Sequence, residues 1–145
     1  MEVSSAAVDT IFEHEFNRGT VLLTEMEFSS GVKKPKFLIV LNKVSTDSRT
    51  ILFITTSQTD YFDRHPSADH IRLQAAALPY FPKETIIDCR EVWSLDRAIL
   101  KTRYREGVLK FVGVLPVSCL EQIDSLVASS RFISLRDKKD ILGWQ

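Results

Sequence analysis

Phe37-Leu38-Ile39-Val40-Leu41 is the longest unbroken apolar run in the chain, and Ile51-Leu52-Phe53-Ile54 follows shortly after it. Continuous apolar runs, rather than alternating ones, are typical of strands that are covered on both faces. Three strands and a turn are predicted around these runs: Thr20 to Phe28, the turn or loop Ser29-Ser30-Gly31, Lys36 to Lys43, and Thr50 to Ser57. The central part of the chain therefore predicts a curved sheet or a small barrel.

A short amphipathic helix is predicted before the first strand. It follows Ser4-Ser5 and is expected to end near Asn17-Arg18-Gly19. The apolar residues that recur at helical spacing are Val8, Ile11, Phe12 and Phe16. The exposed face of this helix is predicted to be acidic.

The chain after the third strand is less regular. Residues 58–84 are polar, aromatic and proline-containing, which predicts a long excursion with one or two short elements inside it. Two further strands are predicted at Thr85 to Cys89 and at Val92 to Ile99. Lys101 to Gly107 is predicted to be a charged hairpin or loop.

Two helices are predicted at the end of the chain. Ser118-Cys119-Leu120-Glu121 matches a capping box, and Leu120, Ile123, Leu126 and Val127 form one apolar face. Ser134-Leu135-Arg136-Asp137 is a weaker start signal for a last short helix through Leu142. Strands first and helices last predict a mainly β fold with some α, an antiparallel barrel with helices packed against it.

Composition and length fit one compact domain. The 145 residues are 44% hydrophobic and 26% charged, which suffices for a single core. We predict one domain over residues 1–145, with an N-terminal helical appendage at 1–18, a barrel at 19–115 and C-terminal helices at 116–145. Lys plus Arg and Asp plus Glu are each 19, so the net charge is zero and any site for a polyanion must be local.

A cytoplasmic protein without a membrane segment is expected. Asp9, Glu13 and Glu15 have the wrong charge for the start of a signal peptide, and the longest apolar run is far shorter than the roughly twenty residues of a membrane helix. Cys89 and Cys119 are too few for a disulfide framework and lack the spacing of a metal finger. Both cysteines are expected to be small core residues, and no cofactor is expected.

Two short polar segments are candidates for binding a phosphate. Lys33-Lys34-Pro35-Lys36 places three ammonium groups just before the apolar strand, where the alternative interpretation is a solvated strand entrance. Thr55-Thr56-Ser57 follows the next apolar run and offers hydroxyl and backbone N–H groups, although such residues are common where strands end.

The main basic patch is predicted over residues 97–110, because this stretch contains five basic residues and a single acidic residue, Glu106. His65 and His70 lie beside aspartates in the excursion. Imidazole is a natural acid and base near neutral pH, but two exposed loop histidines are the favoured interpretation, and their spacing is not diagnostic of a metal site. Asp88 and Arg90, at i and i+2, are expected on the same face of a strand, either as a surface ion pair or as a pair that orients a phosphate.

The order of these segments resembles the MazF/PemK toxin family. Gly19-Thr20-Val21-Leu22 resembles the family's G-D-I-V signature, and Gly31 with Lys34-Pro35 resembles its R-P signature. Ile54-Thr55-Thr56-Ser57 resembles the T-S signature and Ile87-Asp88-Cys89-Arg90 the T-I-D signature. Leu109 to Gly113 resembles the closing signature. The resemblance covers about residues 19 to 130. It implies a small SH3-like barrel of the CcdB type, a homodimer and a partner antitoxin.

The resemblance also implies an activity, namely metal-independent endoribonuclease cleavage of single-stranded RNA through attack by a 2′-hydroxyl. Lys34 then stands for the family's catalytic arginine, and Thr56, or Thr55 if the register slips by one, for its threonine. Asp88, Arg90 or a loop histidine is expected to complete the acid and base pair. The residues expected to bind RNA are Lys33, Lys36, Ser57, His65, Arg97, Lys101 and Arg103.

Two alternatives follow from departures from the family pattern. Lysine and arginine are not interchangeable where a planar fork holds a phosphate, so Lys34 leaves open a non-catalytic SH3-like module that binds a protein. Poisoning of DNA gyrase is a third possibility, although residues 140–145 carry no recognisable signature for it. The first interpretation predicts that Lys34→Ala abolishes RNA cleavage while the protein stays folded.

Overall fold

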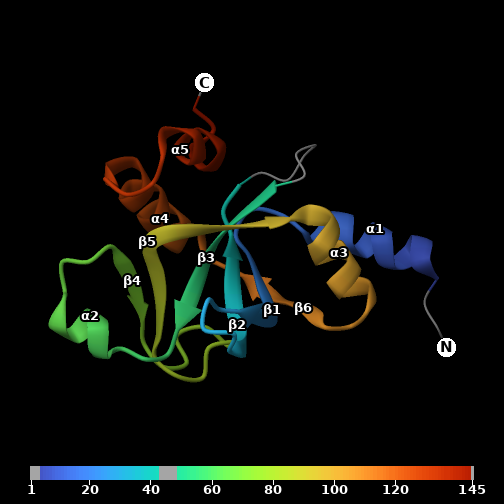
Figure 1. The fold of residues 1–145 in the computed structure, drawn as a ribbon, viewed down its shortest axis with the longest axis horizontal. Coiled ribbons are helices and arrows are strands. Elements are labelled where there is room, and N and C mark those ends of the chain that lie inside the picture. The colour runs from blue at the N-terminus through green and yellow to red at the C-terminus, as the bar shows by residue number, and fades with distance from the viewer. Residues whose placement is uncertain (1–3, 43–48, 145) are drawn as a thin grey trace.

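The computed structural model describes residues 4–42 and 49–144 and contains helices at both ends of a single sheet (Figure 1). The elements in chain order are α1 (Ser5–Glu15), β1 (Thr20–Glu27), β2 (Lys33–Val40), β3 (Arg49–Thr56), α2 (Asp60–Arg64), β4 (His70–Leu73), β5 (Thr85–Asp96), α3 (Arg97–Arg105), β6 (Leu109–Val114), α4 (Val117–Ser129) and α5 (Leu135–Leu142). No helix in these two ranges is long and apolar enough to cross a membrane.

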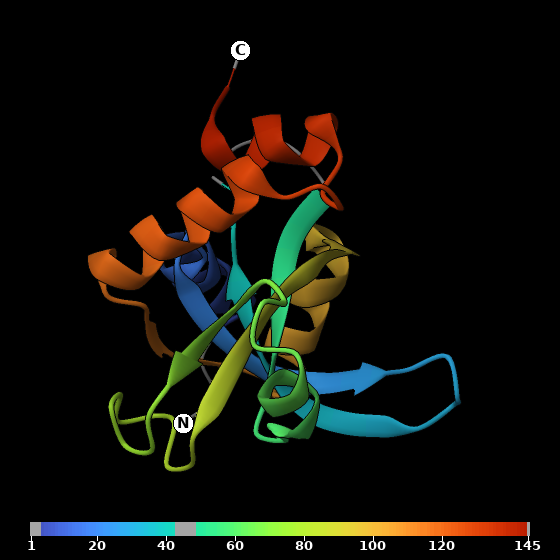
Figure 2. The same cartoon turned by 90° about the vertical axis from the view of Figure 1, so that its left-hand side faces the viewer.

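The six strands form one antiparallel sheet in the order β4-β5-β3-β2-β1-β6. The sheet curls into a half-barrel, with α4 and α5 beside one face and α1 and α3 on the other side (Figures 1 and 2). The predicted barrel-like, mainly β fold with N-terminal and C-terminal helices is therefore confirmed.

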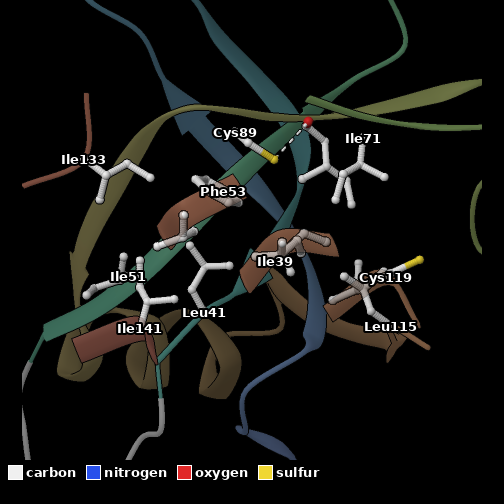
Figure 3. Close-up of a cluster of buried hydrophobic side chains, with 14 of the residues drawn as sticks. Ile39, Leu41, Ile51, Phe53, Ile71, Cys89, Leu115, Cys119, Ile133 and Ile141 are labelled. Atoms are coloured by element: carbon white, nitrogen blue, oxygen red, sulfur yellow. Dashed lines mark hydrogen bonds between the residues drawn. The ribbon is translucent and has the colours of Figure 1, made fainter. Parts of the chain in front are cut away.

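The apolar runs of β2 and β3 fill two separate hydrophobic cores. Ile39 and Phe53 point into a core under α4 and α5, which we call the α4 core and which Figure 3 shows in close-up. Leu38 and Leu52 point to the opposite face, into a core under α1 and α3 that we call the α1 core. Successive strand residues alternate between faces, so an unbroken apolar run supplies both cores at once. The prediction that these strands are covered on both sides is confirmed.

The first and last helices match their predictions. Phe12 and Phe16 are buried in the α1 core, and the side chain of Ser4 accepts the Ala7 N–H at the start of α1. The Ser134 hydroxyl likewise accepts the Asp137 N–H at the start of α5. The capping box predicted at Ser118 is wrong, because α4 begins at Val117 directly after Pro116. The φ of −59° at Pro116 already suits a helix start, so Ser118 falls inside the first turn.

The segment from Thr85 to Arg105 differs most from prediction. One continuous strand, β5, replaces the two predicted strands, and a register shift against Leu52/Ile54 of β3 accommodates its length. Residues 97–105 form a helix, so both the predicted strand end at Ile99 and the predicted loop from Lys101 are wrong. The side chain of Asp96 accepts the Ala98 N–H and starts α3, and Leu100 anchors the helix in the α1 core.

The remaining expectations divide between confirmed and corrected. The excursion at 58–84 contains two short elements, α2 and β4, as predicted. The lysine segment does not precede β2 but belongs to it, because Lys33 and Lys34 pair with Glu27 and Met26 of β1. Lys43, the predicted end of that strand, lies outside the described residues. Cys89 and Cys119 are both free and buried, as expected.

Candidate functional site

A cavity of about 550 Å³ opens on the sheet face of the α1 core, at the end of β3, beside the middle of β2 and β5 and next to α2. We call it the central cavity. It brings together Thr56, Asp88 and Arg90, three of the four predicted catalytic residues, with Lys36. Its lining is completed by Phe28, Ile54, Thr55, Gln58, Asp60, Tyr61, Phe62, Arg64, Glu91 and Trp93.

The register of the sheet explains why these polar side chains share one face. Leu38 of β2 pairs with Ile54 of β3, and Ile54 pairs with Asp88 of β5. Two-residue periodicity then puts Lys36, Thr56 and Arg90 on the same face, each two residues from a member of that row. The apolar row of the α1 core thus continues into a polar row beside the end of β3.

Asp88 and Arg90 form a two-pronged ion pair. The Arg90 Nε donates to Asp88 Oδ1 at 2.9 Å and its Nη2 donates to Oδ2 at 2.8 Å. The guanidinium also lies over the ring of Tyr61, 4.2 Å from the centroid. The hydrogen bond that Arg90 donates to Asp88 raises the pKa of Arg90, so Arg90 is a fixed cation in a fixed orientation. The expected placement of the two residues on one strand face is confirmed.

Lys36 is the only lysine among the residues that line the central cavity. Burial, and to a lesser degree the charge of Lys34, lowers the pKa of Lys36. Lys34, the fourth predicted catalytic residue, is exposed and does not line the cavity. Lys33 lines a different cavity, beside Arg103 and Glu27. Of the three clustered lysines, the structure therefore brings Lys36 to Thr56, Asp88 and Arg90.

The two threonines at the end of β3 have different roles. The Thr55 hydroxyl donates to the Phe37 carbonyl at 3.0 Å, so its proton is already used within the sheet. The Thr56 oxygen accepts the N–H of Gln58 at 3.1 Å, which leaves the Thr56 hydroxyl proton able to donate. Of the two register alternatives, Thr56 is the better donor to a bound ligand.

Two further cavities, one smaller and one larger, adjoin the central cavity and share lining residues with it. A side cavity of about 170 Å³ shares Lys36, Thr55 and Thr56 with it and adds Ser57 and Lys83. An outer cavity of about 740 Å³ shares Tyr61, Arg90 and Glu91 with it and adds His65. Ser57 and His65, both predicted to bind RNA, thus line cavities that adjoin the central cavity. We call the three adjoining cavities the groove.

His65 and His70 have different surroundings. The ring of His65 is exposed and lies 4.4 Å from the ring of Tyr61. His70 belongs to β4, packs on Phe62 and places Nδ1 2.5 Å from the Ala68 carbonyl oxygen, which indicates a structural role. Within residues 4–42 and 49–144, no group of three histidine, cysteine, aspartate or glutamate residues could hold a metal ion.

The predicted basic patch is covered by the acidic face of α1. Glu13 pairs with Arg97 and, at 3.1 Å, with Lys101, while Asp9 pairs with Arg105 at 2.7 Å. The hydrogen bond from Arg105 lowers the pKa of Asp9. Arg103 donates to the Glu25 carbonyl. Arg97, Lys101 and Arg103, all predicted to bind RNA, do not line the groove.

Sequence reasoning missed the aromatic lining of the groove. Tyr61 and Phe62 stand in the excursion, and Trp93 makes an edge-to-face contact with Phe28 at 6.0 Å. The adjacent aromatic pair in α2 was the available signal, but only the fold brings it to Arg90.

No protein-family model and no curated protein matches this chain. A fixed guanidinium, a lysine with a lowered pKa, a donor hydroxyl and a carboxylate together suit binding of an anion and transfer of a proton beside it.

Proposed function

We propose that this protein is a metal-independent endoribonuclease that cuts single-stranded RNA, and that it is the toxin of a toxin–antitoxin pair. The observation that carries the proposal is the convergence of Lys36, Thr56, Asp88 and Arg90 in one cavity lined with aromatic rings. In the reaction, the 2′-oxygen of one nucleotide bonds to the adjacent phosphorus and the bond from phosphorus to the 5′-oxygen breaks. The products are a cyclic phosphate and a 5′-hydroxyl.

Arg90 and Thr56 are suited to hold the reacting phosphate. Asp88 fixes the plane of the guanidinium, so its remaining N–H groups are already oriented toward an anion. Negative charge grows on the phosphorane oxygens in the transition state, and an oriented cation stabilises it without reorganisation. The free proton of the Thr56 hydroxyl supplies a second donor to a phosphate oxygen.

Lys36 and Asp88 are suited to the two proton transfers. A protonated lysine with a lowered pKa gives up its proton more readily than a free lysine, so Lys36 protonates the departing 5′-oxygen. Asp88 is the carboxylate beside Arg90, and it accepts the proton of the 2′-hydroxyl. This assignment gives the role of catalytic cation to Lys36 rather than to Lys34.

The surroundings of the phosphate site favour single-stranded RNA over a duplex. Unpaired bases stack on aromatic side chains, and Tyr61, Phe28 and Trp93 provide such surfaces along the central cavity. The antitoxin and the homodimer are proposed on the resemblance of the sequence to the MazF/PemK family. Lys36 and Arg90 supply local positive charge at the central cavity of a chain with no net charge.

The test is cleavage of a long mixed-sequence RNA by purified protein in EDTA, with the 5′ ends of the products mapped. Wild-type protein is expected to give 5′-hydroxyl ends, and Lys36→Ala and Thr56→Val to slow cleavage by about a hundredfold, the size expected for loss of general acid catalysis or of a phosphate donor. Lys34→Ala is the matched control, because it removes a lysine from the same strand face outside the cavity.

The outcomes are distinct. Circular dichroism spectra of all variants establish that each is folded. Equal loss of cleavage in Lys34→Ala and Lys36→Ala would overturn the assignment of Lys36. An absence of cleavage by folded wild-type protein would favour the other candidate, a barrel that binds a protein partner through the groove.

A further inference from the structure

The outer cavity has a different chemical character from the central cavity. Its lining contains Phe132 from the segment between α4 and α5, together with Tyr61 and His65. Phe132 is 79% exposed, the most exposed of the large apolar side chains in the described ranges. An aromatic ring that stands free at the mouth of a cavity offers a stacking surface for a planar ligand.

The outer cavity also lies where the sheet loses a strand. The pairing of β4 with β5 stops at His70 and Asp88, and a last backbone hydrogen bond joins the Cys89 N–H to the Asp69 carbonyl. Beyond it, Arg90 and Glu91 continue β5 without β4 beside them. This step in the sheet edge leaves room for a ligand between Asp69 and Glu91.

Asp88, which lines the central cavity, is held in an ion pair with Arg90. The two carboxylates at the step in the sheet edge are not held in this way. Asp69 and Glu91 have no ion pair and no side-chain hydrogen bond among the described residues. Asp69 is half-buried, and Arg90 directs its two-pronged contact to Asp88 rather than to Glu91. The carboxylates of Asp69 and Glu91 therefore remain available to accept hydrogen bonds from a ligand in the outer cavity.

We infer that the outer cavity is a base-recognition subsite that selects guanine in the nucleotide next to the cleaved phosphate. This inference rests on the proposed function, because it places the phosphate at Arg90, which lines both cavities. The base stacks on Phe132, and its edge reaches the carboxylates of Asp69 and Glu91.

The chemistry of the base edges selects guanine among the four bases. Guanine presents two adjacent donors, N1–H and N2–H, which match the two oxygens of one carboxylate. Uracil presents one donor between two carbonyl oxygens, and those oxygens are repelled by a carboxylate. Adenine and cytosine present an amino group beside a ring nitrogen that also accepts, so they satisfy a carboxylate with one bond only. Bidentate contacts of this kind discriminate between bases by about tenfold or more.

The test measures binding without any need for cleavage. Guanosine, adenosine, cytidine and uridine 5′-monophosphates are titrated into the full chain, and backbone amide NMR shifts report the site and the affinity. Guanosine monophosphate is expected to bind about tenfold more tightly than uridine monophosphate, with shifts at Asp69, Glu91 and Phe132.

Two variants and two controls separate the contributions of the carboxylates and of the aromatic ring. The double variant Asp69→Asn with Glu91→Gln is expected to lose the guanine preference, because each carboxamide replaces an acceptor oxygen by a donor. Phe132→Ala is expected to weaken all four nucleotides by about tenfold or more through lost stacking. Glu121→Gln and Leu135→Ala change exposed side chains of the same types on α4 and α5 and are expected to bind like wild type.

The results distinguish this inference from the proposed function. Equal binding of the four nucleotides, or a guanine preference that survives in the double variant, would overturn the guanine subsite. A guanine preference in a protein that cuts no RNA would overturn the endoribonuclease and keep the subsite. Cleavage at sites without a preferred guanine beside the cut would overturn the guanine subsite and keep the endoribonuclease.

Discussion

Lys34 and Lys36 differ by two positions on the same strand face, yet their environments differ. Lys36 is half-buried at the edge of the central cavity, whereas Lys34 is exposed. Because the two ammonium groups repel each other, the charge of Lys34 contributes to the lowered pKa of Lys36. The charge of the exposed Lys34 therefore influences the pKa of the half-buried Lys36.

This coupling predicts how the pH profile of cleavage responds to Lys34→Ala. If Lys36 is the proton donor, activity falls as the pH rises through its lowered pKa. Removing Lys34 raises that pKa toward its ordinary value, so the alkaline fall moves to higher pH. The measurement is kcat/KM for a short RNA between neutral and strongly alkaline pH.

Lys33→Ala is the control for this pH experiment, because Lys33 points to the opposite strand face. Its profile is expected to match that of wild type. An alkaline limb that stays in place in Lys34→Ala, or moves to lower pH, would remove Lys36 from the proton transfer.

At the same scale, local periodicity explains what the sequence could predict of the site. Asp88 and Arg90 are neighbours through alternation within one strand, which needs no knowledge of the fold. Lys36 and Tyr61 line the same cavity as Arg90 only because β2, β3 and β5 pair in register and α2 lies beside the end of β3. Three of the four predicted catalytic residues therefore lie together, while the choice between Lys34 and Lys36 depended on where the sheet ends.

Among the elements, α1 and α3 are joined by both apolar and charged contacts. Phe12 stacks on Phe16 at 4.6 Å and lies near Tyr104 of α3, while Glu13 binds Arg97 and Lys101. The buried rings keep α1 in place when its charges are changed. The cations of α3 are thereby matched by carboxylates and are a weak surface for RNA.

The salt dependence of RNA binding tests this neutralisation. Each phosphate contact in single-stranded RNA contributes roughly 0.7 to the slope of log affinity against log salt. Lys101→Ala is expected to leave the slope for a 2′-O-methyl RNA unchanged, whereas Lys36→Ala lowers it by about 0.7. The double variant Asp9→Asn with Glu13→Gln frees the cations of α3 and is expected to steepen the slope. A slope that falls in Lys101→Ala would return α3 to the RNA-binding surface.

The same pair of helices explains the largest error of element prediction. The strands β2 and β3 and the helix α1 were predictable because their apolar residues follow a clear period. In α3 only Leu100 is buried. The helix also contains five charged or polar residues, a composition that is typical of a loop. Its helical form depends on the packing of Leu100 and Tyr104 against Phe111 and against Phe12, which lies far away in the sequence.

For the whole molecule, the two cores are not independent, because β2 and β3 supply side chains to both. Ile51 belongs to the α4 core and Leu52 to the α1 core, although they are consecutive residues. A strand cannot leave one core while it remains in the other. We therefore expect the described fold to unfold as one cooperative unit.

Urea denaturation followed by two probes tests this cooperativity. In a Trp144→Phe variant, Trp93 beside the α1 core is the remaining tryptophan, and far-UV circular dichroism reports the whole chain. The two transitions are expected to coincide. Ile51→Ala and Leu52→Ala are each expected to lower the free energy of unfolding by about 2–5 kcal/mol and to shift both probes together. A tryptophan transition at lower urea than the dichroism transition would contradict a shared unit.

The position of β1 in the sheet has a consequence for the synthesis of the protein. Although β1 comes early in the chain, it lies between β2 and β6, and the helix before it packs on α3. Phe12 and Phe16 therefore leave the ribosome long before Leu100 and Phe111, which cover them. While the segment between them is synthesised, the nascent chain carries two phenylalanines that lack these partners, a natural target for chaperones that bind exposed apolar segments. The α1 core is thus completed only after β6 has been synthesised.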